Sequence, residues 1–188
     1  MTTTHGFLRD YSPPAQLFHW GSALLVLFAW ALGSFGDDLP KGSIRNLGEF
    51  VHVSAGQLIL ILLLARLAWR AISPPPPPET TPLGKWADRG GVAMHYVLYA
   101  LLVAAPVAGV VTLFANGESL PLFGLGEIPS PWLKDKAFAH DVKEIHETLA
   151  NALIILALAH AGAALAHHFY FHDRTLKRML PNIFDANV

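Results

Sequence analysis

The chain has 188 residues, of which 53% are hydrophobic and 14% are charged, and its formal net charge is -1 at pH 7. Soluble domains carry about 25% charged residues, so this composition indicates a membrane protein, and the nearly neutral charge argues against a nucleic-acid partner. The lack of cysteine excludes disulfides, cysteine-held iron–sulfur clusters and thiolate zinc sites. The ten histidines are therefore the candidate ligands for a metal or cofactor.

The first two apolar runs cover residues 13–36 and 48–71. Each is long enough for a helix across the hydrocarbon core, which takes roughly 20 apolar residues. His19 lies near the start of the first run and His52 near the start of the second, whereas Arg66 lies towards the end of the second. The N-terminus lacks a cleavable signal pattern, so we expect the first run to remain in the mature protein.

Two further apolar runs cover residues 90–114 and 143–171. Five consecutive prolines, Pro74 to Pro78, precede the third run and predict an extended, polyproline-like connection. The connection from 118 to 143 is rich in glycine, proline and acidic residues. Together these features predict an all-α membrane protein, a four-transmembrane-helix up-down bundle formed by residues 1–188 as a single domain.

The distribution of lysine and arginine predicts the orientation, because cytoplasmic segments carry an excess of both. With the N-terminus inside, eight basic residues lie in inner segments and five in outer segments. We therefore expect both termini to be cytoplasmic. The inner residues are Arg9, Arg66, Arg70, Lys85, Arg89, Arg174, Lys177 and Arg178, and the outer residues are Lys41, Arg45, Lys134, Lys136 and Lys143.

The last apolar run contains histidines at a spacing that places them on one stripe. His146 and His160 are 14 residues apart, which in a helix gives roughly 21 Å of rise and about 40° of rotation. Both rings therefore face the same side, one near each membrane surface, and His167 continues the stripe seven residues later. By depth, His52 joins His146 in an outer layer, and His19 joins His160 in an inner layer, with His95 and His167 also nearby.

Two layers with a histidine from each of two helices predict two six-coordinate haem b groups stacked across the membrane, because haem iron takes one axial ligand on each face. The predicted iron ligands are His19, His52, His146 and His160. Two alternatives exist: each histidine could hydrogen-bond a neighbouring helix, or several could form a zinc or copper site. Transport sites usually add carboxylates, and the apolar interiors of the runs contain none.

Several nearby residues have two interpretations. The small residues that follow His52 and His160 leave room for a porphyrin, but they also allow close helix packing. Arg66 lies 14 residues after His52, and therefore in the inner layer. It is a candidate partner for a haem propionate, or an interfacial residue whose side chain reaches the headgroups.

These residues carry a resemblance to the bacterial four-helix cytochrome b561 family, and within it to the small quinone-linked members described as superoxide oxidases. The matching segments are LFHW at 17–20, VHVSAG at 51–56, HYVLYALLVAAPVAG at 95–109, and HETLANALIILALAHAGAALAHHFYFHDRTLKRMLP at 146–181. The resemblance implies a dihaem b protein of the bacterial inner membrane, multi-pass in the lipid bilayer, that moves electrons from superoxide at the outer face to ubiquinone.

The resemblance also implies roles for single residues. The family's axial ligands correspond to His19, His52, His146 and His160, and its quinone-contacting histidine corresponds to His167. At a quinone, His167 could donate a hydrogen bond or a proton, and His95 is a second candidate for this catalytic role. The alternative function is a cytochrome b membrane anchor and electron-transfer subunit for a partner dehydrogenase or hydrogenase, so a redox partner protein is not excluded.

Overall fold

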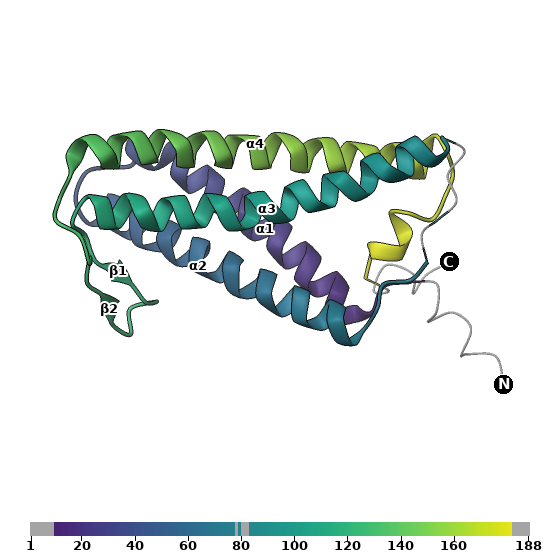
Figure 1. The fold of residues 1–188 in the computed structure, drawn as a ribbon, viewed down its shortest axis with the longest axis horizontal. Coiled ribbons are helices and arrows are strands. Elements are labelled where there is room, and N and C mark those ends of the chain that lie inside the picture. The colour runs from purple at the N-terminus through teal and green to yellow at the C-terminus, as the bar shows by residue number, and fades with distance from the viewer. Residues whose placement is uncertain (1–9, 78, 80–82, 182–188) are drawn as a thin grey trace.

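A computed structural model describes residues 10–77, 79 and 83–181 of the chain, so His5 and Arg9 lie outside the described residues. The described residues form four long helices, each long and apolar enough to cross a membrane (Figure 1). This confirms the predicted four-helix membrane fold. The helices are α1 (Pro13–Phe35), α2 (Ser43–Ile72), α3 (Lys85–Ala115) and α4 (Lys136–Phe169). The short 3-10 helix η1 (Gly36–Asp38) lies between α1 and α2, the strands β1 (Leu120–Pro121) and β2 (Glu127–Ile128) lie between α3 and α4, and the 3-10 helix η2 (Lys177–Met179) follows α4.

The helix ends follow local chemistry rather than the limits of the apolar runs. Prolines occupy the first two positions of α1, where a backbone N–H would have no partner within the helix, so the missing N–H of proline costs no hydrogen bond. The Asp135 carboxylate caps α4 by accepting hydrogen bonds from the backbone N–H groups of Ala137 and Phe138. Helix α4 therefore begins at Lys136, before the apolar run at 143. Helices α2 and α3 likewise begin before their apolar runs.

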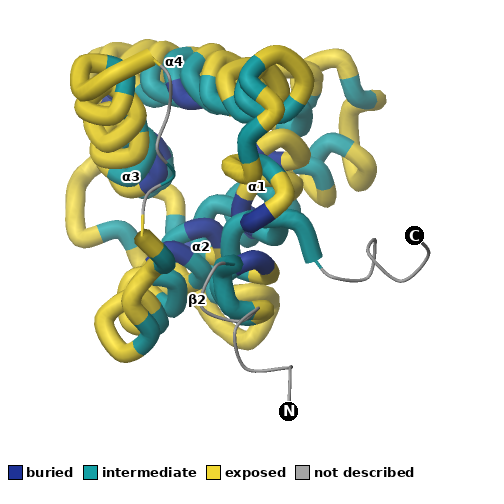
Figure 2. The backbone as a smooth tube through the Cα atoms, turned by 90° about the vertical axis from the view of Figure 1, so that its right-hand side faces the viewer, coloured by how far each residue is buried: buried dark blue, intermediate teal, exposed yellow. Residues whose placement is uncertain are grey.

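The helices pack as two pairs, α1 with α2 and α3 with α4, which diverge towards one end of the bundle (Figure 1). Viewed along the bundle, the four helices surround a common axis and turn their exposed sides outward (Figure 2). Many large apolar side chains are exposed, such as Leu24 at 67% and Ile155 at 65%. In a bilayer these side chains contact lipid. The buried core is small and consists of Val26, Ala29, Ala55, Ile59, Leu63, Leu102 and Leu153.

A short β-hairpin, which the sequence did not predict, lies at one end of the bundle, here called the hairpin end. Its strands pair antiparallel, with Leu120 opposite Ile128. The side chain of Gln57, on α2, donates a hydrogen bond to the Pro121 carbonyl at 2.6 Å. This contact fastens the hairpin to a membrane-spanning helix, and Figure 1 shows the hairpin beside α2.

Both ends of the described chain meet at the opposite end of the bundle, here called the termini end. The Arg174 guanidinium pairs with the Asp10 carboxylate at 3.0 Å. The Trp20 indole donates to the Met179 carbonyl at 2.8 Å. An even number of crossings places both ends on one side, as an up-down bundle requires. Which face of the membrane this end occupies remains a prediction from the basic residues.

Candidate cofactor site between the four helices

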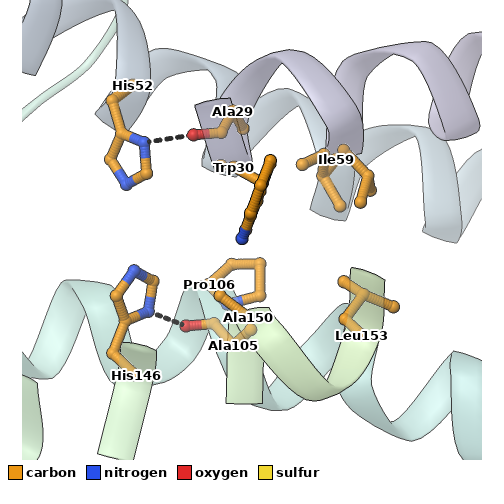
Figure 3. Close-up of a pocket in the computed structure, with 11 residues that line it drawn as sticks. Ala29, Trp30, His52, Ile59, Ala105, Pro106, His146, Ala150 and Leu153 are labelled. Atoms are coloured by element: carbon orange, nitrogen blue, oxygen red, sulfur yellow. Dashed lines mark hydrogen bonds between the residues drawn. The ribbon is translucent and has the colours of Figure 1, made fainter. Parts of the chain in front are cut away.

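Two imidazoles face each other across the bundle near the hairpin end. The ring centroids of His52 on α2 and His146 on α4 lie 6.0 Å apart. Nδ1 of His52 lies 2.9 Å from the Ala29 carbonyl of α1, and Nδ1 of His146 lies 2.8 Å from the Ala105 carbonyl of α3. A carbonyl only accepts, so each Nδ1 carries the hydrogen and donates. Each Nε2 is left with a free lone pair, and the two point at one another (Figure 3).

The helices that accept these hydrogen bonds also make room for the rings. Each of α1 and α3 carries a glycine one turn after the accepting alanine. A Cβ at Gly33 would lie 2.9 Å from Cε1 of His52, and a Cβ at Gly109 would lie 3.2 Å from Cε1 of His146. Real Cβ contacts are rarely this short, so α1 and α3 cradle the two histidines in the same way. Sequence reasoning missed these glycines, although the repeated Ala-x-x-x-Gly spacing was visible.

The space beside these rings is an apolar pocket lined by all four helices, with a cavity volume of about 60 Å³. The Trp30 indole donates to the Asn151 side chain at 2.9 Å and so links α1 to α4 beside the pocket. The other lining residues are Val26, Ala29, His52, Gly56, Ile59, Ala105, Pro106, His146, Ala150 and Leu153.

This arrangement fits a haem group. A metal-bound histidine normally donates its other ring N–H to a carbonyl or carboxylate, which fixes the tautomer and the ring orientation. His52 and His146 both meet that condition before any metal is considered. Their opposed Nε2 atoms would hold a haem iron between α2 and α4, and the apolar side chains that line the pocket beside them suit a porphyrin. Of the small residues considered from sequence, Gly56 lines the pocket, whereas Gly162 is exposed.

A second group of histidines lies nearer the termini end and contains three rings. His160 of α4 lies 6.2 Å from His19 of α1 and 5.1 Å from His95 of α3, measured between ring centroids. Nδ1 of His95 donates to the Gly91 carbonyl at 2.7 Å, on its own helix. Nδ1 of His19 is buried and has no hydrogen-bond partner within the described part of the chain. The structure therefore brings together the predicted pair, His19 and His160, with His95 beside them as expected from its depth.

Arg66 belongs to the same layer. Its guanidinium lies over the Tyr99 ring, 5.3 Å from the ring centroid, and within electrostatic range of the three histidines. The Tyr99 hydroxyl is buried and finds no partner among the described residues. A fixed cation and an unused hydroxyl beside paired imidazoles suit the propionate of a haem. Arg66 itself is half-buried.

His167 lies in the last turn of α4, near the termini end, and contacts a residue that sequence reasoning did not consider. Its Nδ1 lies 2.5 Å from Oδ2 of Asp173, and its ring lies 5.4 Å from the Phe171 ring. Burial raises the pKa of the Asp173 carboxyl, but hydrogen bonds from His167 and the Thr175 N–H outweigh burial and hold the pKa below its ordinary value. Asp173 is therefore an ionised acceptor.

Comparison with known proteins gives consistent matches over nearly the whole chain. The sequence profile of a family described as "Prokaryotic cytochrome b561" matches residues 10–182. Cytochrome b561 homolog 2 of Escherichia coli (strain K12) is 36% identical over 174 residues, which cover 90% of each protein. Cytochrome b561 homolog 1 of the same organism is 34% identical over 183 residues, 93% of this chain and 98% of the relative. The "Probable superoxide oxidase CybB" of Yersinia pestis is 33% identical over 175 residues, 92% of this chain and 97% of the relative.

Proposed function

The chain belongs to the prokaryotic cytochrome b561 family, and on that premise we propose that it is a superoxide:ubiquinone oxidoreductase. It is a multi-pass electron-transfer protein of the bacterial inner membrane, in a family that binds haem b. The proposal extends this in three respects: the number of haem groups, the electron donor and the electron acceptor.

We assign two haem b groups to the two histidine layers. His52 and His146 are the proposed ligands at the hairpin end, and His19 and His160 those at the termini end. The single observation that carries the assignment is the opposed pair of His52 and His146, whose Nδ1 atoms are both held by backbone carbonyls. Arg66 is the proposed propionate partner in the second layer. Bound haem supplies reversible one-electron chemistry at its iron.

The proposed reaction joins two half-reactions on opposite faces of the membrane. Two superoxide ions each lose one electron and leave as dioxygen, while one ubiquinone gains two electrons and two protons and becomes ubiquinol. The hairpin end is assigned to the outer face, in accord with the basic residues counted above. The name of the Yersinia pestis relative supports superoxide as the donor.

His167 is the proposed catalytic residue at the quinone. Its Nδ1 is engaged by Asp173, so Nε2 is the atom left to donate a hydrogen bond or a proton to a quinone carbonyl. His95 is the second candidate, since its Nδ1 is likewise engaged and its ring is exposed at the same end. Separate His167→Ala and His95→Ala variants decide between the two residues, because ubiquinol formation should fall only in the variant that lacks the catalytic histidine.

The test uses the purified, haem-loaded protein in liposomes that contain ubiquinone. Xanthine oxidase and xanthine supply superoxide outside, and ubiquinol is measured over time. We expect ubiquinol to accumulate and superoxide dismutase to abolish it. If superoxide produces no ubiquinol, and the quinone is reduced only when a co-purified dehydrogenase or hydrogenase is added, the oxidase assignment is wrong and the protein is a membrane anchor subunit.

A further inference from the structure

We propose that Asp173 is the positioning residue for His167, holding the imidazole in one tautomer and one orientation for proton donation to the quinone. The inference rests on the proposed function of His167. It adds a residue outside the membrane-spanning helices, in the turn that follows α4.

The turn after α4 brings the chain back onto the helix end. Helix α4 ends at Phe169, and His172 takes a positive φ of 55°, which is uncommon for a residue with a Cβ. The backbone N–H of Asp173 then donates to the His167 carbonyl at 3.1 Å. Backbone and side chain of Asp173 therefore both contact His167, and this double contact fixes where the carboxylate lies.

The two oxygens of Asp173 have separate tasks. Oδ2 meets Nδ1 of His167 at 2.5 Å, whereas Oδ1 accepts the backbone N–H of Thr175 at 2.9 Å. Both side chains of the pair are largely covered, with 18% of His167 and 12% of Asp173 exposed. Neighbouring arginines pair elsewhere: Arg174 with Asp10, and Arg178 with Glu79. The carboxylate thus faces the imidazole rather than a guanidinium.

This geometry has a chemical consequence at the other ring nitrogen. Because the carboxylate accepts the Nδ1 hydrogen, a neutral His167 keeps its lone pair on Nε2. When the ring takes a second proton, that proton sits on Nε2 and can pass to a quinone oxygen, while Nδ1 keeps its hydrogen. Water at the membrane surface then returns the proton to Nε2. An aspartate that orients an imidazole in this way acts through the histidine and does not itself transfer the proton.

The test compares Asp173→Asn with His167→Ala in the haem-loaded protein. An asparagine keeps one carbonyl oxygen for the Thr175 N–H but removes the acceptor for Nδ1, so it separates the turn from the histidine contact. We expect Asp173→Asn to lower kcat for superoxide-driven ubiquinol formation by about tenfold or more, with KM for ubiquinone, haem content and haem reduction by superoxide unchanged. Asp173→Glu should recover part of the rate.

Two further variants make the outcomes decisive. Arg174→Gln changes a charge in the same turn and should leave kcat unchanged. The double variant, Asp173→Asn with His167→Ala, should have the same kcat as His167→Ala alone. If His167→Ala lowers kcat but Asp173→Asn does not, the positioning role is overturned and the proposed function stands. If His167→Ala itself has no effect, the quinone role of His167 fails, and the inference fails with it.

Discussion

Gly33 lies so close to the His52 ring that a Cβ there would stand 2.9 Å from Cε1, so α1 admits the imidazole only because residue 33 has no side chain. The same relationship links α3 to His146 at 3.2 Å through Gly109. Both rings also donate Nδ1–H to the helix that carries the glycine. The orientation of each proposed ligand is therefore set by a helix other than its own.

Replacing Gly33 with alanine should displace the His52 ring and lower haem occupancy at the hairpin end. Gly109→Ala should have a smaller effect, because its neighbour need give only a few tenths of an ångström. Gly21 on α1 is the matched control, since a Cβ there meets Leu62 at an ordinary 3.9 Å. Haem per chain, measured in purified protein, should fall in the order Gly21→Ala, Gly109→Ala, Gly33→Ala. Equal haem content in all three would show that the glycines do not set the site.

Removal of single histidines should deplete haem by layer. His52→Ala or His146→Ala should each lose mainly the haem at the hairpin end, leaving about half of the total. His19→Ala or His160→Ala should lose mainly the other, because two imidazoles would hold each haem. Haem stoichiometry and reduced absorption spectra measure this directly. Two fully occupied haems after loss of a proposed ligand would refute the pairing.

His95 has the closest ring contact with His160, and its variant tests which histidine is the ligand in the second layer. We expect His95→Ala to retain both haems, because the ring centroids of His19 and His160 lie 6.2 Å apart, close to the 6.0 Å of the opposed pair His52 and His146, whereas the His95 ring packs closer to His160 at 5.1 Å. Haem loss in His95→Ala, with retention in His19→Ala, would assign the ligand to α3 instead.

The helices and histidine layers could be predicted because both follow from one-dimensional spacing. Roughly 20 apolar residues mark a membrane crossing, and a helical repeat of 3.6 residues converts the interval between His146 and His160 into depth and direction. Hydropathy does not mark helix ends, however. Helix α4 begins at Lys136 because Asp135 caps it in the polar region beyond the apolar run.

Contacts between helices could not be predicted in the same way, because they depend on how each helix is rotated about its axis. Gly33, Gly56 and Gly162 look alike in the sequence, yet the first admits a ring, the second lines the pocket and the third is exposed. Asp173 was missed for a related reason. Its contact with His167 depends on a turn with positive φ at His172, where no glycine signals such a turn.

A buried arginine should stabilise the termini end more than an exposed one in the same segment. The Arg178 side chain is only 6% exposed, donates to the Pro77 carbonyl at 2.7 Å and pairs with Glu79 at 3.3 Å. Loss of a buried hydrogen bond from a charged group costs about 2 kcal/mol, so Arg178→Met should lower the thermal midpoint by roughly 4–8 °C.

The exposed Arg174 provides the comparison for this prediction, because 46% of its side chain is accessible in its pair with Asp10. Exposed pairs contribute about 1 kcal/mol or less, so Arg174→Gln should shift the midpoint by at most roughly 4 °C. The midpoint is measured from the absorption of bound haem during heating. Equal shifts in both variants would mean that Arg178 does not hold the polyproline connection to the C-terminal segment.

The stabilising effect of the Asp173 carboxylate should disappear in acid. Its pKa lies below the ordinary value of 3.8 in the folded protein, so folding favours the ionised form. The contribution is complete above the unfolded pKa and is lost as the pH falls through the folded pKa. The difference in thermal midpoint between wild type and Asp173→Asn should therefore be largest near neutral pH and shrink below about pH 4. A difference that stays constant down to about pH 3 would mean that the ionised carboxylate adds nothing through its contact with His167.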